Sequence, residues 1–388
     1  MKNEIVDYLK TVRPFNSHSH HLSDEGYAGM TLAGLFDKSY CGWMDEAPRT
    51  AAQAEAYILK NGCNSYFRWL FEAIEAMYGL PFTAENFDEI ARRVEQTHAD
   101  PSRHIRMLEE WCKYEAIMLD YYDHPGDDLS LPRLFTPVLR CNMFAVCSVP
   151  GERDHNGNNP FDFLGRDYDD FDEYLAAINN HMRGFRALKF AVAYDLDNDI
   201  RRFDQAAAHV AFRNPAADAG QKKAYYDYMI YRLCEMAGDL GIPVQFHTGL
   251  GRLDKSSPLY LTELVAALPG VKFDLFHGGF PWMDDLLALL HNFKNVWADI
   301  CWLPIISTGS ARRFLRDALE TGGAHRILWG CDTHTSEESY GALLAGREAV
   351  ACALDDLFEA GAITDEYALY IARRIWRDNG MELYFPEA

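Results

Sequence analysis

The sequence lacks the features that would place a protein in a membrane or on a nucleic acid. No apolar run approaches the roughly 20 residues that a membrane-spanning helix requires. The N-terminal residues contain no apolar run of signal-peptide length, so we expect no secretion signal. Basic side chains are scarce, with 37 Lys and Arg against 58 Asp and Glu and a formal net charge of −21. Because nucleic acids and anionic membranes attract basic surfaces, this balance argues against both as partners.

Paired cysteines are also missing. The chain has nine cysteines, an odd number, and no two of them stand in a Cys-x-x-Cys spacing. Such cysteines are typical of buried thiols in a reducing compartment rather than of a disulfide framework. We therefore expect a cytoplasmic protein that acts on a small molecule, and the composition leaves open whether it forms a homo-oligomer.

What the sequence does contain is a series of short apolar runs separated by helix-like segments. The runs are typical of buried parallel strands, and we expect eight of them. Their ranges are 12–20, 114–119, 135–139, 185–192, 243–246, 271–276, 296–300 and 326–329. This alternation favours an α/β fold of the (β/α)8 barrel type, in which the strand ends meet on one rim that carries the active site.

The alternation breaks after the first strand, over about residues 22–99. Apolar residues recur there at helical spacing, so we expect a helical insertion. Its predicted helices are 51–59, 65–77 and 84–96. Pro101 suits the first residue of the next helix. Since no repeat or linker is found, residues 1–388 are expected to form one domain, and the Gly-, Pro- and Asn-rich stretch 149–172 a long loop, a candidate lid or rim.

Metal-capable side chains stand at the ends of several runs. His18 and His20 are two residues apart, so in a strand they point to the same face. His247 and His277 each end an apolar run before a glycine-containing turn, and Asp332 ends the last run. Imidazoles and a carboxylate on one rim would make a divalent-metal site. Taken singly, these residues could instead be a surface pair, hydrogen-bonded core histidines and a helix N-cap.

Cations and aromatic residues are expected on the same rim. Lys189 could be carbamylated to bridge two metals, bind a substrate carboxylate or pair with a core acid. Arg140 could clamp a carboxylate with two hydrogen bonds or form a surface ion pair. The aromatic residues expected there are Tyr27, Tyr194, Trp282 and Trp302. They could line a substrate pocket, although core packing explains any single one of them more simply.

The motifs together resemble those of the amidohydrolase superfamily, and more narrowly its amidohydrolase-2 branch of metal-dependent barrels. The matching segments are 16–20, 247–249, 277–279 and 330–332. Residues 189–194 and 247–251 are similar to the subgroup in which an amidohydrolase-like domain is fused to glutamine-synthetase-like domains. The insertion after the first strand is distantly similar to that of uronate isomerases.

This resemblance implies a distorted (β/α)8 TIM barrel that binds a divalent metal, which we expect to be zinc. His18, His20 and Asp332 would be ligands, with His247 as a further ligand when one ion is bound. His277 would be catalytic or would support the ligands. One ion per chain is favoured, and two ions are the alternative, in which a carbamylated Lys189 would form the bridge.

The function that we expect is hydrolysis of an amide, ester or lactone bond in a small substrate that carries a carboxylate. Asp332 would take a proton from a metal-bound water, and His277 would polarise the scissile carbonyl. The substrate would be bound by Arg140, Lys189, Tyr194 and Trp302. Two alternatives remain. The same site could decarboxylate an aromatic or unsaturated acid or isomerise a sugar acid, or the protein could retain a metal without turnover.

Overall fold

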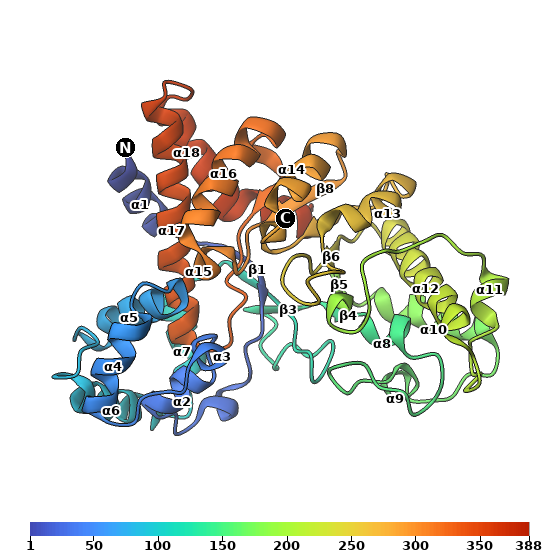
Figure 1. Ribbon diagram of the computed structural model, residues 1–388, viewed down its shortest axis with the longest axis horizontal. Coiled ribbons are helices and arrows are strands. Elements are labelled where there is room, and N and C mark those ends of the chain that lie inside the picture. The colour runs from blue at the N-terminus through green and yellow to red at the C-terminus, as the bar shows by residue number, and fades with distance from the viewer. Residues whose placement is uncertain (388) are drawn as a thin grey trace.

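Figure 1 shows the computed structural model, which describes residues 1–387, with parallel strands in the middle of the molecule and helices around them. Within that range the strands form two sheets, in the orders β1-β2-β3 and β4-β5-β6-β7-β8-β9. The strands are β1 (Phe15–Ser19), β2 (Ala116–Leu119), β3 (Phe135–Pro137), β4 (Leu139–Arg140), β5 (Leu188–Phe190), β6 (Val244–Phe246), β7 (Phe273–Leu275), β8 (Val296–Asp299) and β9 (Ile327–Leu328). Neighbouring strands pair in parallel throughout, so the predicted α/β class is confirmed.

The first junction between the two sheets lies inside the predicted third strand. The Val138 amide donates to Leu119 O at 2.9 Å, whereas the next amide, that of Leu139, donates to Ala187 O at 3.0 Å. Pro137, which has no amide hydrogen, lies where the pairing changes. The prediction of one continuous strand is therefore wrong, because consecutive residues of this segment pair with different neighbours.

The second junction joins the last strand to the first. The Ser17 amide donates to Trp329 O at 3.3 Å, and the Asp332 amide donates to His18 O at 2.8 Å. Gly330 permits this close approach, since a Cβ atom there would clash with Ser17 Oγ and lie 3.0 Å from His18 N. Hydrogen bonding thus continues from β9 to β1 and places the carboxyl ends of these strands side by side.

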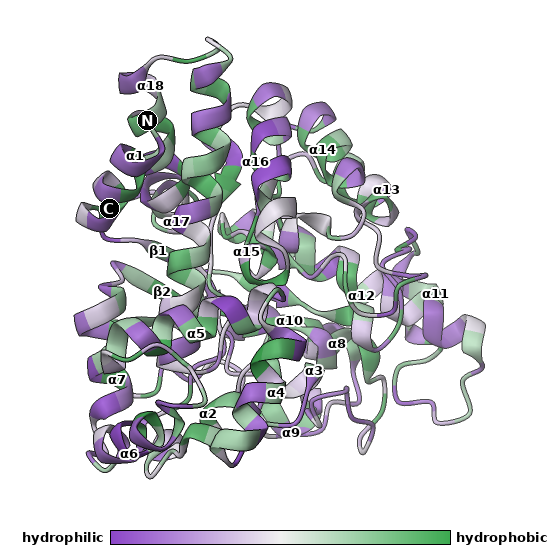
Figure 2. Ribbon diagram, turned by 60° about the vertical axis from the view of Figure 1, so that its left-hand side comes forward, coloured by the Kyte–Doolittle hydropathy of each residue, from purple (hydrophilic) through white to green (hydrophobic). Residues whose placement is uncertain are grey.

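Helices occupy much of the remaining chain. They are α1 (Lys2–Thr11), α2 (Leu32–Asp37), α3 (Cys41–Met44), α4 (Ala51–Asn61), α5 (Ser65–Tyr78), α6 (Phe87–His98), α7 (Arg103–Met107), α8 (Asn142–Val146), α9 (Pro160–Leu164), α10 (Phe171–Met182), α11 (Gln205–His209), α12 (Ala219–Leu240), α13 (Thr262–Ala267), α14 (Met283–Asn292), α15 (Leu303–Ile306), α16 (Thr308–Gly322), α17 (Ser336–Glu359), α18 (Asp365–Arg373) and α19 (Asn379–Tyr384). Hydrophilic residues gather on outer helices such as α16, as Figure 2 shows, because the opposite faces pack against the core.

The predicted helices between the first two strands are present as α4, α5 and α6. Helix α5 ends at Gly79, whose φ of 72° is a left-handed conformation that suits glycine. The prediction for Pro101 is wrong, because the next helix begins at Arg103. The side chain of Asp100 accepts the Ser102 amide at 3.0 Å and forms a turn in front of that helix instead.

The helices of this segment share a hydrophobic cluster of their own, separate from the main core. Its fully buried members are Leu35, Phe36, Ala54, Phe67, Ile74, Ile90, Val94 and Met107. Such burial stabilises the segment without contacts from the strands. That residues 1–388 form a single domain remains a prediction.

Two other segments differ from the sequence-based expectation. The predicted loop 149–172 contains helix α9, which begins at Pro160 after the side chain of Asn159 accepts the Phe161 amide at 2.9 Å. The predicted fourth strand is shorter than expected: β5 is followed at Val192–Tyr194 by a 3-10 turn. Both differences concern the loops that follow strands, where the site lies.

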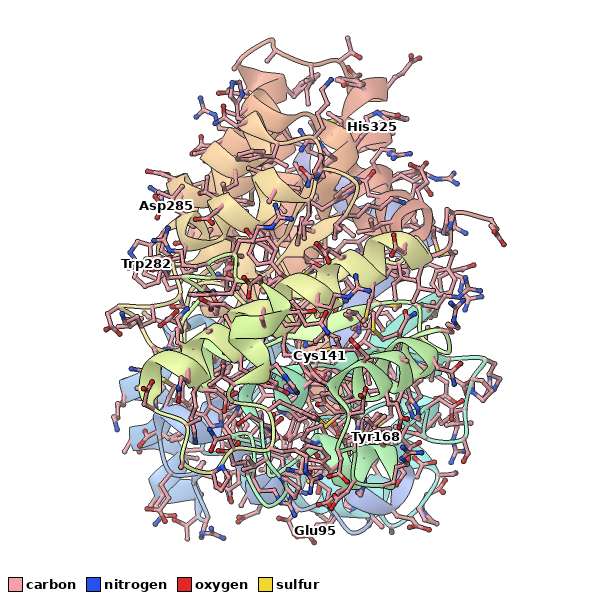
Figure 3. All side chains as sticks on the ribbon, turned by 90° about the vertical axis from the view of Figure 1, so that its right-hand side faces the viewer. Glu95, Cys141, Tyr168, Trp282, Asp285 and His325 are labelled. Carbon is pink, nitrogen blue, oxygen red and sulfur yellow. The ribbon has the colours of Figure 1, made fainter. Side chains whose placement is uncertain are left out.

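The interior contains most of the cysteines, and all nine are free thiols. Cys141 lies near the middle of the view in Figure 3, whereas Trp282 and Glu95 lie near its edges. Across residues 1–387, no helix combines the length and apolar character needed to cross a bilayer.

Candidate metal centre

A cavity of about 260 Å³ lies where the strands end. Every residue that the sequence assigns to metal binding, catalysis or substrate binding lines it: His18, His20, Arg140, Lys189, Tyr194, His247, His277, Trp302 and Asp332. The other lining residues are Tyr40, Trp43, Tyr122, His155, Asn156, Ala191 and His334. The strands therefore bring together side chains that are far apart in the sequence, as the strand-end pattern predicts.

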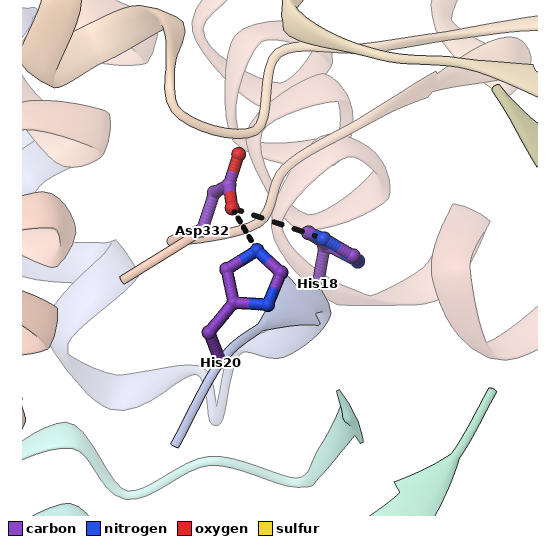
Figure 4. A group of neighbouring side chains, drawn as sticks. All are labelled: His18, His20 and Asp332. Atoms are coloured by element: carbon purple, nitrogen blue, oxygen red, sulfur yellow. Dashed lines mark ion pairs between the residues drawn. The ribbon is translucent and has the colours of Figure 1, made fainter. Parts of the chain in front are cut away.

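His18 on β1 and His20, which directly follows that strand, face Asp332, which follows β9 (Figure 4). His20 Nε2 lies 3.1 Å and His18 Nε2 3.8 Å from Asp332 Oδ1. One ligand atom from each of the three residues lies within 4.8 Å of the others. His18 and Asp332 are only 1% and 3% exposed, so these polar groups are largely shielded from water.

The hydrogen bonding of this group fits a metal. Asp332 Oδ1 and His18 Nδ1 are buried without a hydrogen-bond partner among the described residues. An unpaired buried polar atom costs roughly 1–3 kcal/mol, which a cation at the carboxylate oxygen would offset. His20 Nδ1 donates to Asp120 O at 2.8 Å, so its Nε2 presents a lone pair toward Asp332. Two imidazoles and a carboxylate are the donor set of a zinc site with an open position.

The protonation states also suit metal binding. Burial alone would raise the pKa of the Asp332 carboxyl, but the adjacent His20 ring and the fields of His18 and His277 hold that pKa well below its usual range. Burial, together with the charge of Lys189, lowers the pKa of His18 well below its usual value. At neutral pH the site therefore offers neutral imidazole and ionised carboxylate, as a metal requires.

Strained backbone gathers at the same place. His277, Trp302 and Asp332 are non-glycine residues with positive φ angles of 65°, 65° and 52°. Each such conformation costs on the order of 1 kcal/mol or more, and proteins retain it chiefly at functional sites. These backbone conformations direct the side chains of His277, Trp302 and Asp332 into the same cavity.

His247 and His277 face each other through one nitrogen of each ring. His277 Nε2 lies 2.9 Å from His247 Nδ1, while His247 Nε2 donates to Leu250 O and His277 Nδ1 donates to Cys301 O at 3.0 Å. Because carbonyls only accept, the two facing nitrogens both carry lone pairs when the rings are neutral. The pair thus presents acceptors to a bound cation or donor, and metal ligation by His247 stays a prediction.

His277 also belongs to a second potential ligand group, which the sequence did not indicate. Its Nδ1 lies 3.5 Å from Asp332 Oδ2 and 3.4 Å from Cys301 Sγ. Asp332 therefore turns one oxygen toward His18 and His20 and the other toward His277. Burial raises the pKa of the Cys301 thiol well above its usual value, so without a metal the thiol stays neutral.

Arg140 is held by an acid that sequence reasoning missed. Its Nη1 pairs with Asp120 Oδ2, and both side chains are buried. The same Asp120 oxygen lies 3.8 Å from His18 Nε2. A signal was present, because Asp120 directly follows the second predicted strand just as Asp332 follows the last. The alternative of a surface ion pair for Arg140 is wrong, because its ion pair with Asp120 is buried on the cavity wall, and its binding of a substrate carboxylate stays a prediction.

Lys189 is a buried cation in the cavity. Its Nζ lies 3.6 Å from the centre of the Phe276 ring, and the residue is 2% exposed. Burial lowers the pKa of Lys189 to about 8, although Asp120 and Asp332 oppose the shift. A lysine with a pKa near 8 exists partly as the free amine, which can be carbamylated, and partly as the ammonium, which can attract a substrate carboxylate.

Aromatic rings cover much of the cavity wall. Tyr40 stacks on Trp302 at 4.8 Å between ring centres, and Tyr194 lies 4.7 Å from the His247 ring. Tyr27 and Trp282, which the sequence also suggested, are not among the described residues that line the cavity. Tyr27 instead stacks on His104, with 3.7 Å between ring centres, so for this residue core packing is the role observed.

His334 also lines the cavity and stacks on His20 at 5.3 Å between ring centres. Burial lowers the pKa of His334 to about 3, so it is neutral. His21 points away from the His18 group and donates through Nδ1 to His334 O at 3.0 Å. It thereby supports the segment that carries Asp332.

The comparison with known families identifies the family to which this chain belongs. A model of the amidohydrolase family matches residues 160–374, more than half of the sequence, and the chain belongs to that family. The resemblance seen in the sequence motifs is thus confirmed. The chain is also 29% identical over 203 residues to Protein fluG of Emericella nidulans. That alignment covers 49% of this chain and 23% of the relative, so the chain spans less than a quarter of that protein's length.

Solved structures share the fold over nearly its whole length. Glucuronate isomerase from Caulobacter crescentus has a TM-score of 0.78 at 14% identity, covering 100% of this chain and 94% of its own. Uronate isomerase from Thermotoga maritima has a TM-score of 0.77 at 14% identity, covering 99% and 97%. A protein described as a metal-dependent hydrolase from Lactobacillus casei has a TM-score of 0.71 at 18% identity, covering 99% and 98%. At such identities the similarity establishes the fold and not the reaction.

Proposed function

We propose that this protein is a metal-dependent hydrolase that cleaves an amide, ester or lactone bond in a small substrate carrying a carboxylate. The observation that carries the proposal is the convergence of His18, His20 and Asp332, with buried atoms that have no partner within the protein. We interpret the two linked sheets as one distorted (β/α)8 barrel with a helical insertion at about residues 22–99. Its rim would hold one divalent ion, most simply zinc.

A divalent ion held by His18, His20 and Asp332, with His247 available as a further ligand, would supply a water of lowered pKa and an electrophile for the scissile carbonyl. Asp332 would accept the proton of the attacking water, since its carboxyl is ionised at neutral pH. The oxygen suited to this is Oδ2, which lies on the His277 side, 3.5 Å from His277 Nδ1. The same carboxyl would then return the proton to the leaving group.

His277 would polarise the carbonyl of the substrate by turning the hydrogen of its Nδ1 from Cys301 O toward the carbonyl oxygen. Burial lowers the pKa of His277 to about 4, so the ring is neutral and cannot compete as a cation with the metal. Its ring packs edge-on against that of Trp302, with 5.1 Å between ring centres, and this contact keeps it at the cavity wall. Lys189 and Arg140 would attract the carboxylate of the substrate, and Tyr194 and Trp302 would enclose its apolar part.

A second candidate keeps the site and changes the reaction. Isomerisation of a sugar acid, or decarboxylation of an aromatic or unsaturated acid, would use His277 or Asp332 to move a proton to or from carbon. The two uronate isomerases of similar fold favour this candidate over a protein that retains metal without turnover.

Turnover measurements separate these candidates. Purified protein loaded with zinc or manganese would be assayed against N-acyl amino acids, dipeptides, lactones and sugar acids, with Asp332→Asn as the matched control. Hydrolysis that is lost in the control supports the proposal. Isomerisation or decarboxylation without hydrolysis supports the second candidate, and metal binding without turnover of any of these compounds contradicts both.

A further inference from the structure

The loop after α8 brings into the cavity a histidine that the metal group does not use. His155 lines the cavity, and its side chain is 26% exposed. Its Nδ1 lies 2.7 Å from Asp195 Oδ2, and its backbone amide donates to Asp195 Oδ1 at 2.8 Å. Asn142 Nδ2 donates to the same Asp195 Oδ2 at 2.9 Å. Both oxygens of the nearly buried Asp195 therefore hold His155 in one orientation.

The neighbours of His155 also fix its proton. An ionised carboxylate only accepts, so Nδ1 of His155 carries a hydrogen and donates it to Asp195. A guanidinium only donates, and Arg140 Nη2 lies 3.3 Å from His155 Nε2. Nε2 is therefore the unprotonated nitrogen of a neutral ring, a hydrogen-bond acceptor on the wall of the cavity.

Arg140 and His155 thus place a donor and an acceptor side by side. Arg140 Nη1 is committed to Asp120, whereas the contact of Nη2 with His155 is long for a hydrogen bond. A substrate carboxylate that bound at Nη2 would free Nε2 of His155 to accept from a donor next to that carboxylate. A carboxylic acid with a hydroxyl or amino group on the adjacent carbon offers both groups at this spacing.

We propose that His155 makes the site select carboxylates with a hydrogen-bond donor on the neighbouring carbon, namely 2-hydroxy acids and 2-amino or 2-acylamino acids. The inference rests on the proposed function in one respect, that the substrate carries a carboxylate. Asp195 is the positioning residue, because it keeps the hydrogen on Nδ1 and leaves Nε2 as an acceptor. Without it the ring could turn a donor toward the cavity.

Mandelate and phenylacetate are suitable probes of this selection. They differ only in the 2-hydroxyl group, and their ring matches the aromatic walls formed by Tyr40, Tyr194 and Trp302. Affinities would be measured by titration calorimetry on the metal-loaded protein. We expect one enantiomer of mandelate to bind about tenfold more tightly than phenylacetate, which corresponds to one net hydrogen bond.

Variants assign this preference to His155. In His155→Leu the mandelate preference should fall to within about twofold, while phenylacetate affinity changes little, and Asp195→Leu should act in the same direction. His155→Gln, whose amide oxygen can accept, should keep part of the preference. The control is His291→Leu, since His291 is an exposed residue near the end of α14 outside the cavity. It should behave like the unaltered protein.

Three results would overturn the inference. Equal binding of mandelate and phenylacetate by the unaltered protein would overturn it without touching the proposed function. If a folded His155→Leu variant kept the preference for mandelate, the 2-hydroxyl group would be bound by the metal and not by His155. Failure of both acids to bind would contradict the part of the proposed function that gives the substrate a carboxylate. The inference depends on that carboxylate and would be wrong as well.

Discussion

Asp332 Oδ1 lies 3.1 Å from His20 Nε2, although the two residues come from opposite ends of the chain. The contact exists because the Asp332 amide donates to His18 O and fastens the segment after β9 to β1. The backbone bond and the side-chain group are thus parts of one arrangement. A change that separates β9 from β1 would dismantle the metal site even if each ligand stayed in the sequence.

Replacing the proposed base should abolish turnover and leave the fold intact. In Asp332→Asn the amide has nearly the same shape as the carboxylate but cannot accept the proton of the water. We expect kcat to fall by roughly 10² to 10⁴, with little change in the circular dichroism spectrum. Full activity of a metal-loaded variant would show that another residue is the base, most simply His277.

Lys189 decides between one metal ion and two. We expect Lys189→Met to keep about one equivalent of metal, because a site with one ion does not need Lys189 as a ligand. The variant should raise KM for carboxylate substrates, because methionine lacks the charge that attracts the carboxylate. Elemental analysis and initial-rate kinetics measure both quantities. The opposite result is a metal content near two equivalents that drops to one in the variant, with the two ions roughly 3.5 Å apart, bridged by a carbamylated Lys189.

Glu337 gives a prediction about pH. This buried carboxylate accepts hydrogen bonds from His98 Nε2 at 2.7 Å, Tyr78 Oη at 2.6 Å and Ser336 Oγ at 2.9 Å. Burial raises the pKa of Glu337, but these partners, His98 first, outweigh it and lower the pKa below its usual value. Its contribution to stability is therefore complete above the pKa of the unfolded state, roughly 4.3, and is lost as the pH falls through the lower folded-state pKa.

Glu337→Gln should accordingly lower the free energy of unfolding at pH 7 by roughly 1–3 kcal/mol, and the difference from the unaltered protein should shrink below about pH 4. Urea unfolding at several pH values measures this. Glu366→Gln is the matched control, since Glu366 is exposed and should have no such effect. A difference that stayed constant between pH 7 and pH 3 would show that the charge of Glu337 is not involved.

The sequence predicts the rim well because strand ends are local features. An apolar run that stops at a polar residue marks His247, His277 and Asp332, and parallel pairing then brings such ends together. Asp120 obeys the same rule, but no glycine stands directly after it, so the pattern of a strand ending before a glycine turn does not mark it. His155 could not be predicted in this way, because a loop places it and only three-dimensional contacts with Asp195 show which nitrogen is free.

The division of the third strand also escaped prediction. The run 135–139 is apolar except for Thr136, and nothing in it marks where the partner changes, since the partner of each amide depends on how far the neighbouring strands are displaced. The contacts of His247 with His277 and Leu250 O are likewise not visible in the sequence, which places His247 with the ligands, and its metal ligation stays a prediction. The direction of a side chain within a crowded cavity depends on contacts between distant segments, and the apolar pattern of the sequence does not predict those contacts.

The most direct test of the account is the metal content of the purified protein. Elemental analysis after dialysis against zinc should find about one equivalent per chain, and the double variant His18→Ala, His20→Ala should hold less than about a tenth of an equivalent, since a site with two of its three ligands removed cannot retain the ion. The control His291→Ala should keep its metal. Less than about a tenth of an equivalent in the unaltered protein, with no uptake of zinc or manganese, would contradict the central claim.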